Sequence, residues 1–349
     1  MNSKDFPLEY FYDESITNFY VIFTNITTGI TVALVPIYFY VIYTRSKDLG
    51  SFKWFMLNYS VWFLCLDIAL CYSKPLILNP AAAGVVLGPL RESGNHTTSI
   101  IFILLVCILG GCSVGGASVT LAYRYAGLFP GMISTIFASK GSLVVYFLLH
   151  LGSLSFVGVM SIQFFLMKRE DIISDALEYS PVLEKFTSEF TFMFLNKDII
   201  KGGMITAFYA LIFITCLIIV VMISLLYKLY HMKTTTWRSK TQKNLLISGF
   251  GQVTITFGLL FCPILMFISA MIYDTPYSGP RFMIVLCGMS LHAMIEMITT
   301  MCFVSPYRRF FVKLFNKLLR KTGTESHMTS KVNQKSGQGN LQNTATLRT

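Results

Sequence analysis

Charged residues are scarce in this sequence. Asp, Glu, Lys and Arg together make up 13% of the 349 residues, whereas ordinary soluble domains carry about 25%. Hydrophobic residues account for 54%, and the mean hydropathy is +0.61. So little charge is not enough to cover the surface of a soluble domain of this length. The composition therefore excludes a soluble protein and indicates one with several membrane spans.

The motifs of catalysis and of metal or phosphate binding are also missing. There is no Walker motif, Gly-rich phosphate loop, nucleophile elbow or HExxH sequence. All eight cysteines fall within apolar runs and form no CxxC pair, which is typical of small buried hydrophobic residues. His292 and Glu296 have the spacing of metal ligands, but His150 is the only other histidine within a span, and zinc needs more ligands. We therefore expect no enzyme, no catalytic residue, no metal and no cofactor, and set aside an intramembrane metal hydrolase.

A secretory signal peptide is lacking too. The first 15 residues hold four acidic residues against the single Lys4, which is the wrong charge for the start of a signal peptide. The first apolar run is also too long for a signal peptide, so we expect it to remain as a membrane span.

Seven apolar runs are long enough to cross a bilayer, since about 20 helical residues span its hydrocarbon core. They cover residues 17–43, 54–78, 98–123, 142–167, 203–230, 244–273 and 282–304. After them, Arg309, Lys313 and Lys317 recur at every fourth position among Phe and Leu, a pattern typical of a helix lying in the membrane interface. The predicted fold is an all-α membrane protein with an extracellular N-terminus (1–16), a seven-helix transmembrane domain (17–304), an amphipathic interfacial eighth helix (305–321) and a disordered cytoplasmic tail (322–349).

Basic residues gather on one side of the predicted membrane. Lys and Arg are concentrated in segments 44–53, 124–141 and 228–243 and after residue 305, where nine basic residues face one acidic residue. Segment 168–201, by contrast, has five basic and seven acidic residues. Because Lys and Arg favour the cytoplasmic side, we expect a plasma-membrane protein with its N-terminus outside and its C-terminus inside. This placement accounts for the net charge of +11 without a nucleic-acid partner, and it makes Asn95, in Asn-His-Thr, a predicted glycosylation site.

Several polar residues lie inside predicted spans, where they are costly and often functional. Asp67, near mid-membrane, and Lys74 share a face of the second span, while His292 and Glu296 share a face of the seventh. Asp67, Glu296 and Gln252 form either a polar network that rearranges between states or a static hydrogen-bonded patch. Lys74 either pairs internally with Asp67, extends to the interface, or meets an anionic or carbonyl ligand in an outer cavity. A seven-span transporter or channel would instead use Asp67, Lys74 and Glu296 along a polar path.

Motifs in several spans resemble the Srh class of nematode serpentine chemoreceptors, in the Str superfamily. The end of the seventh span resembles its S-x-H and PYR patterns, at Ser290-Leu291-His292 and Pro306-Tyr307-Arg308. The second span matches through Lys53-Trp54, Leu57-Asn58, Trp62 and Asp67, and the sixth through Gln242, Leu246 and Gln252 before Pro263. The similarity covers the chain up to about residue 321.

One departure from that class concerns the third span. The class ends this span in a box like Glu-Asn-Arg-Tyr, whereas this chain has Ala122-Tyr123-Arg124-Tyr125. In receptors of this general type the acid restrains the arginine in the inactive state. Its absence leaves three interpretations: higher basal activity, a different restraint, or an Arg124 that serves only as a cytoplasmic positive charge.

The resemblance implies a G-protein-coupled chemoreceptor that detects an odorant or pheromone-like small molecule and activates a heterotrimeric G protein. It also implies a place in sensory-neuron cilia. The ligand would contact Lys74 and His292, and Pro263 would act as a hinge. The residues expected to couple to the G protein are Arg124, Tyr125, Lys240, Lys243 and Arg308. The sequence leaves open whether the receptor works alone or as a dimer.

Overall fold

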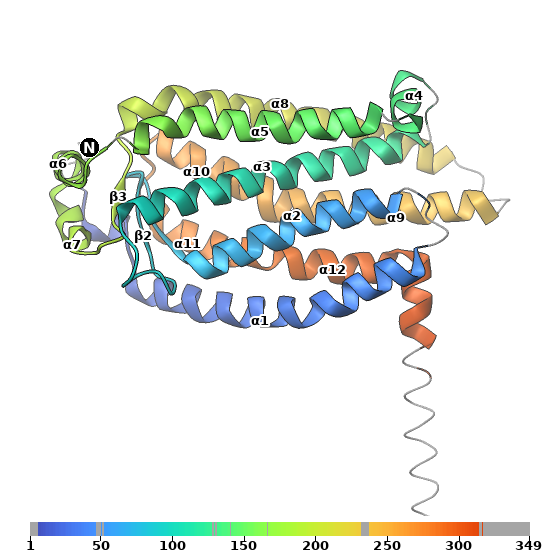
Figure 1. The fold of residues 1–349 in the computed structure, drawn as a ribbon, viewed down its shortest axis with the longest axis horizontal. Coiled ribbons are helices and arrows are strands. Elements are labelled where there is room, and N and C mark those ends of the chain that lie inside the picture. The colour runs from blue at the N-terminus through green and yellow to red at the C-terminus, as the bar shows by residue number, and fades with distance from the viewer. Residues whose placement is uncertain are drawn as a thin grey trace, which may run out of the picture.

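Seven long helices form an elongated bundle in the computed structural model (Figure 1). The structure describes residues 6–46, 50, 52–127, 129, 131–139, 141–165, 167–231, 237–313 and 316. Within these residues, seven helices are long and apolar enough to cross a membrane. The predicted seven-helix membrane bundle is therefore confirmed. The predicted tail, 322–349, lies outside the described residues.

Five spans are single helices and two are interrupted. The single ones are α1 (Glu14–Arg45), α2 (Phe52–Ser73), α3 (His96–Ala126), α5 (Gly141–Phe165) and α8 (Lys197–His231). The sixth span consists of α9 (Trp237–Thr256), the π-helical segment η5 (Phe257–Phe261) and α10 (Cys262–Ile272). The seventh consists of α11 (Ser278–Ser290) and α12 (His292–Phe303), separated by Leu291.

The interruption of the sixth span has a local cause. Pro263 is the second residue of α10, and a proline inside a helix lacks an N–H donor and crowds the carbonyl four residues earlier. That carbonyl belongs to Leu259, in the middle of η5. The wider turns of η5 accommodate this defect, as π-helical segments inside helices do. The expected irregularity at Pro263 thus extends over the turn before it.

The second span ends earlier than the sequence suggested. We expected it to reach residue 78, but α2 stops at Ser73 and residues Pro75–Leu78 form the strand β1. Pro75 disfavours right-handed helical geometry at the residue before it. Lys74 lies outside that geometry, with a positive φ of 43°. Lys74 therefore lies at the junction between helix and strand rather than inside a membrane helix.

A small sheet and several short helices cover one end of the bundle, at the left of Figure 1. Strand β1 pairs antiparallel with β2 (Ala83–Val86), which pairs antiparallel with β3 (Met193–Phe194). Beside β3 lie α6 (Arg169–Tyr179), η4 (Pro181–Leu183) and α7 (Glu184–Thr187), while η2 (Leu8–Tyr10) packs on α11. We call β1–β3, α6, η4 and α7 the sheet cover, and this end of the bundle the sheet end.

Side-chain contacts to backbone hold the sheet cover together. Arg169 donates hydrogen bonds to the carbonyl oxygens of Thr187, Glu189 and Phe190 at 2.8–3.2 Å. Ser99 at the start of α3 donates to the Thr191 carbonyl oxygen at 2.5 Å. All eight cysteines are free, so no disulfide contributes. The cover is therefore a folded unit stabilised by hydrogen bonds and by its buried apolar residues.

The opposite end carries α4 (Met132–Ala138) and a helical stretch over residues 305–313, which turns away from the bundle (Figure 1). Tyr307, fully buried, bonds to Ser46 at the end of α1 with an O–O distance of 2.6 Å. Asn244 of α9 donates to the Ser305 hydroxyl at 2.7 Å. The predicted interfacial helix, 305–321, is not confirmed, because much of it falls outside the described residues.

Candidate functional site

A buried hydrogen-bond network joins three spans between the middle of the bundle and the end opposite the sheet. Arg124 of α3 donates from Nη2 to the side-chain oxygen of Gln252 on α9. The Gln252 amide nitrogen donates to Glu296 Oε1 at 2.8 Å and to Thr300 Oγ1 at 2.9 Å, both on α12. Thr300 itself donates to Glu296 Oε1 at 3.1 Å. We call these four residues the Arg124 network; Gln252 is its centre, because it bonds to both other helices.

The packing around Arg124 fixes the guanidinium group in place. Its Cζ lies 5.0 Å from the centre of the Phe52 ring, a distance typical of a cation–π contact. On the other side lies Gly249 of α9, where an added Cβ would overlap Arg124 Nη1. Only glycine leaves the space for α9 to approach the guanidinium this closely. Neither Gly249 nor Phe52 was expected from the sequence to take part in the site.

One turn along α9, Thr256 links the network toward His292. Thr256 Oγ1 donates to the Gln252 carbonyl oxygen at 2.9 Å, so its only proton is used. Tyr59 OH lies 2.8 Å and His292 Nε2 lies 3.4 Å from that same oxygen. A hydroxyl has a single proton, so we assign Tyr59 and His292 as the donors to this oxygen. With this assignment the proton of a neutral His292 ring sits on Nε2, and Nδ1 is an acceptor.

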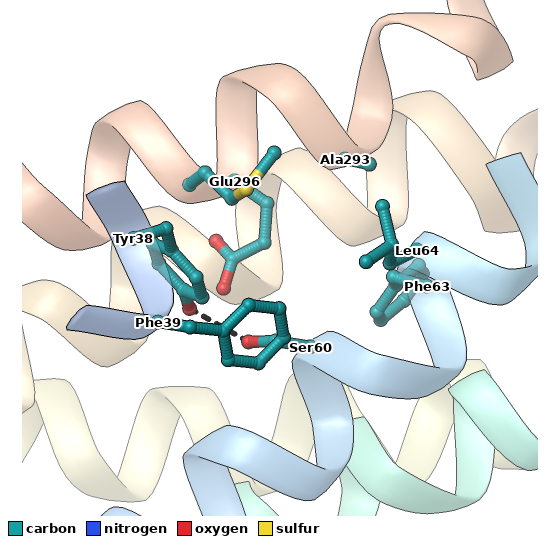
Figure 2. A pocket seen from close by; sticks show the side chains of 8 residues that line it. Tyr38, Phe39, Ser60, Phe63, Leu64, Ala293 and Glu296 are labelled. Carbon is teal, nitrogen blue, oxygen red and sulfur yellow. Dashed lines mark hydrogen bonds between the residues drawn. The ribbon is translucent and has the colours of Figure 1, made fainter. Parts of the chain in front are cut away.

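A small cavity lies beside Glu296, lined by α1, α2 and α12. Its lining residues are Tyr38, Phe39, Ser60, Phe63, Leu64, Ala293, Glu296 and Met297, and it has room for about one water molecule. Figure 2 shows the Glu296 carboxylate pointing toward the hydrogen bond between Tyr38 and Ser60, whose oxygens are 2.6 Å apart. Glu296 Oε2 is buried without a hydrogen-bond partner among the described residues. We call this space the Glu296 cavity.

Asp67 lines a second cavity, closer to the sheet end. This cavity is enclosed by Phe63, Leu66, Asp67, Leu70, Leu260, Met289, His292 and Ala293. Asp67 is 4% exposed, and neither of its carboxylate oxygens accepts a hydrogen bond within the described part of the chain. The neighbouring hydroxyl of Thr31, on α1, donates to the Thr27 carbonyl oxygen instead, at 2.9 Å. We call this space the Asp67 cavity.

The structure separates Asp67 and Glu296, which were expected to lie at similar depth in one network. Glu296 faces Ser60 of α2, whereas Asp67 lies seven residues further along that helix, roughly 10 Å away. Phe63 and His292 stack between them with ring centres 4.0 Å apart. Of the three residues predicted to form one network, Gln252 and Glu296 are hydrogen-bonded to each other, and Asp67 bonds to neither within the described residues. The hydrogen-bond partners of Glu296 are Gln252 and Thr300.

The pairing of Lys74 with Asp67 is not formed. The one salt bridge within the described residues joins Arg91 and Glu189, in the segments that flank the sheet cover. Lys74 lies one residue beyond the end of α2, and it lines neither of the two cavities. Lys74 and His292 were predicted together as ligand contacts. In the structure, His292 lines the second of these cavities and Lys74 does not.

The other predicted coupling residues lie at the end opposite the sheet. Tyr125 stacks on Phe129, with ring centres 4.4 Å apart, while Lys243 is half-buried and Arg308 is exposed. Lys240 belongs to α9, but its side chain lies outside the described residues. From the Pro306-Tyr307-Arg308 motif, Tyr307 makes the buried contact to α1. Arg308, the next residue, is exposed.

Asn95 forms the N-terminal cap of α3. Its side-chain oxygen accepts a hydrogen bond from the Thr98 backbone N–H at 2.9 Å, and the Asn95 N–H donates to the Thr98 hydroxyl at 3.1 Å. This reciprocal pair is a capping box. Asn95 is exposed at the sheet end, and the box uses its oxygen, whereas a glycan would attach through its nitrogen.

Comparison with known proteins identifies one family. A family model described as serpentine type 7TM GPCR chemoreceptor Srh matches residues 15–317, which include the first span from its second helical residue and the other six spans completely. No curated protein matches the chain.

Proposed function

The chain belongs to the Srh family of serpentine seven-helix chemoreceptors, and from that premise we propose that it detects a small molecule and activates a heterotrimeric G protein. The family is a receptor family rather than an enzyme class. We propose further that the sheet end faces the outside of the cell and that the end bearing residues 305–313 faces the cytoplasm. The excess of Lys and Arg in segments 44–53 and 228–243, which follow α1 and α8 at that end, supports this orientation.

The Arg124 network is the observation that carries the proposal. The family's acid before the arginine is absent, yet Arg124 is held by Gln252 and, through it, by Glu296. Three spans are thereby tied together near the end proposed to receive the G protein. A ligand that binds better to a state without this tie would shift the receptor toward that state. The network would thus restrain signalling where the acid does so in related receptors.

The interruptions of the sixth span provide a point at which α9 can move relative to α10. Gln252 lies fewer than two turns before η5, and Pro263 lies two residues after the end of η5. Helix kinks concentrate at π-helical segments and prolines, because backbone hydrogen bonds are weakened there. Release of Gln252 from Arg124 would let α9 pivot at η5 away from α3. The cavity opened beside Arg124 would receive a G-protein helix.

Nucleotide exchange tests this proposal. The full chain is expressed with each of several Gα subunits, and a panel of volatile and water-soluble small molecules is screened for stimulated exchange. The Arg124→Ala variant should reach the cell surface but lose stimulated exchange, whereas Arg309→Ala, which removes an exposed charge at the same end, should keep it. Normal exchange with Arg124→Ala would remove Arg124 from the mechanism, and flux of a panel compound without exchange would favour a transporter.

The contacts within the described residues favour the receptor over a polar transport path. Asp67 and Glu296 line separate cavities that each hold about one water molecule, with the Phe63–His292 stack between them. Lys74 lines neither cavity. The three residues that a transporter would need in sequence therefore do not form a continuous route.

A further inference from the structure

Two irregularities of the fold meet at the Asp67 cavity. Leu260 belongs to η5, and Met289 and His292 lie on either side of the break at Leu291. π-helical segments and broken spans are costly, and they concentrate at binding sites in membrane proteins. The cavity is therefore bordered on two sides by helices that can change shape there at low cost.

Two buried acceptors without donors belong to the wall of this cavity. Asp67 and His292 are each 4% exposed, and neither carboxylate oxygen of Asp67 has a hydrogen-bond partner within the described residues. His292 Nδ1 is also without one, and it is an acceptor in the tautomer assigned above. The remaining wall is apolar and offers no donor. Buried polar atoms without partners are destabilising, so a group that satisfies both would bind favourably.

The residues that line the Asp67 cavity indicate which chemical group it would bind. A carboxylate ligand supplies no donor and would be repelled by Asp67. An alcohol supplies one donor and no charge. A primary ammonium group supplies three N–H donors and a positive charge, and its size is close to that of the single water molecule that the cavity can hold. Apolar side chains such as Leu66 and Leu70 surround the cavity, which favours a hydrocarbon as the group attached to the nitrogen. The cavity has room for the ammonium group alone, so this hydrocarbon must be short, and the wall at η5 and Leu291 must move apart to admit it.

We propose that the Asp67 cavity binds the ammonium group of a small primary alkylamine, with Asp67 as its counter-ion and His292 Nδ1 as a second acceptor. This ligand class rests on the receptor function proposed above. Binding would move η5 and the Leu291 break to make room for the amine. Because His292 contacts Thr256, which bonds to the Gln252 backbone, such a change would reach the centre of the Arg124 network.

Thermal unfolding of the purified full chain in lipid nanodiscs tests the proposal without a G protein. n-Propylamine should raise the Tm in a saturable manner, whereas 1-propanol and propionate should not. Asp67→Asn, which keeps the size of the side chain but removes its charge, should weaken the apparent amine affinity by about tenfold to a hundredfold, as expected for a lost charge-assisted hydrogen bond. Each shift is measured against the variant's own Tm, so a change in basal stability does not obscure it.

A matched control comes from the same helix. Ser73→Ala removes a buried hydroxyl that donates only within α2, and it should leave the amine response unchanged. An equal shift with 1-propanol, no shift with n-propylamine, or an unchanged response in Asp67→Asn would each overturn the proposal. Those outcomes would not bear on nucleotide exchange in response to other compounds. Amine binding without any nucleotide exchange would instead refute the proposed receptor function.

Discussion

Gly249 of α9 lies against the guanidinium group of Arg124, with no room between them for a methyl group. The hydrogen bond from Arg124 to Gln252, one turn further along α9, depends on this close approach. The close contact of Gly249 with Arg124 thus fixes the position of α9 relative to α3. The restraint on Arg124 is therefore as much a matter of space as of charge.

Gly249→Ala should displace Arg124 from Gln252. The added methyl group cannot fit without moving α9 or the guanidinium, and overpacking of this kind costs about 1–3 kcal/mol. The Tm of the purified protein should fall and ligand-independent nucleotide exchange should rise. Gly110→Ala on α3 is the matched control, because nothing lies within 4 Å of its added Cβ. Equal Tm values for the two variants would contradict the close packing.

Gln252→Ala should raise basal signalling several-fold, because it removes both the bond to Arg124 and the bonds to α12. Glu296→Gln is the informative comparison. It keeps a side-chain oxygen that accepts from Gln252 and Thr300, so its basal exchange should stay near that of the wild type. The measurement is exchange on an added G protein at matched receptor density. Basal exchange that does not change in Gln252→Ala would show that the network is a static patch.

Glycosylation of Asn95 can be separated from its capping role. Thr97→Ala destroys the Asn-His-Thr sequon but leaves the capping box with Thr98, whereas Thr98→Ala does the reverse. Thr97→Ala should therefore abolish a glycosidase-sensitive shift in mass without lowering the Tm. Thr98→Ala should keep the shift and lose about 1 kcal/mol of stability. The absence of any shift in the wild type expressed in animal cells would count against an external sheet end.

The salt bridge between Arg91 and Glu189 should make the sheet cover sensitive to acid. Arg91 donates hydrogen bonds to Glu189 at 2.6 and 3.1 Å, and these hold the pKa of Glu189 below its ordinary value of 4.5. The stabilisation is therefore present above pH 4.5 and is lost as the pH falls through the lowered pKa. Amide exchange in residues 187–195 should quicken below about pH 4. Arg91→Gln should remove this pH dependence; if it persists there, another group is responsible.

The spans were predictable because each is a long apolar run, and the membrane leaves few alternatives to helix. The strand β1 was missed because Pro75–Leu78 continues the apolar run of α2, although Pro75 itself signals the end of the helix. Arg124, Gln252 and Glu296 were recognised as polar residues in the membrane. Their partners depend on the rotation and depth of each helix in the bundle, which the sequence does not encode locally, so the sequence could not show that Asp67 lies apart from the bonds between Gln252 and Glu296.

The way in which the sheet cover is held together has a practical consequence for producing the protein. Its strands, the Arg169 contacts and the Arg91–Glu189 pair hold it without a single covalent cross-link, since every cysteine is a free thiol. Folding of this end therefore does not depend on an oxidising compartment or on a disulfide isomerase. The protein should tolerate dithiothreitol throughout extraction and purification, and a reducing bacterial host is a suitable source of it.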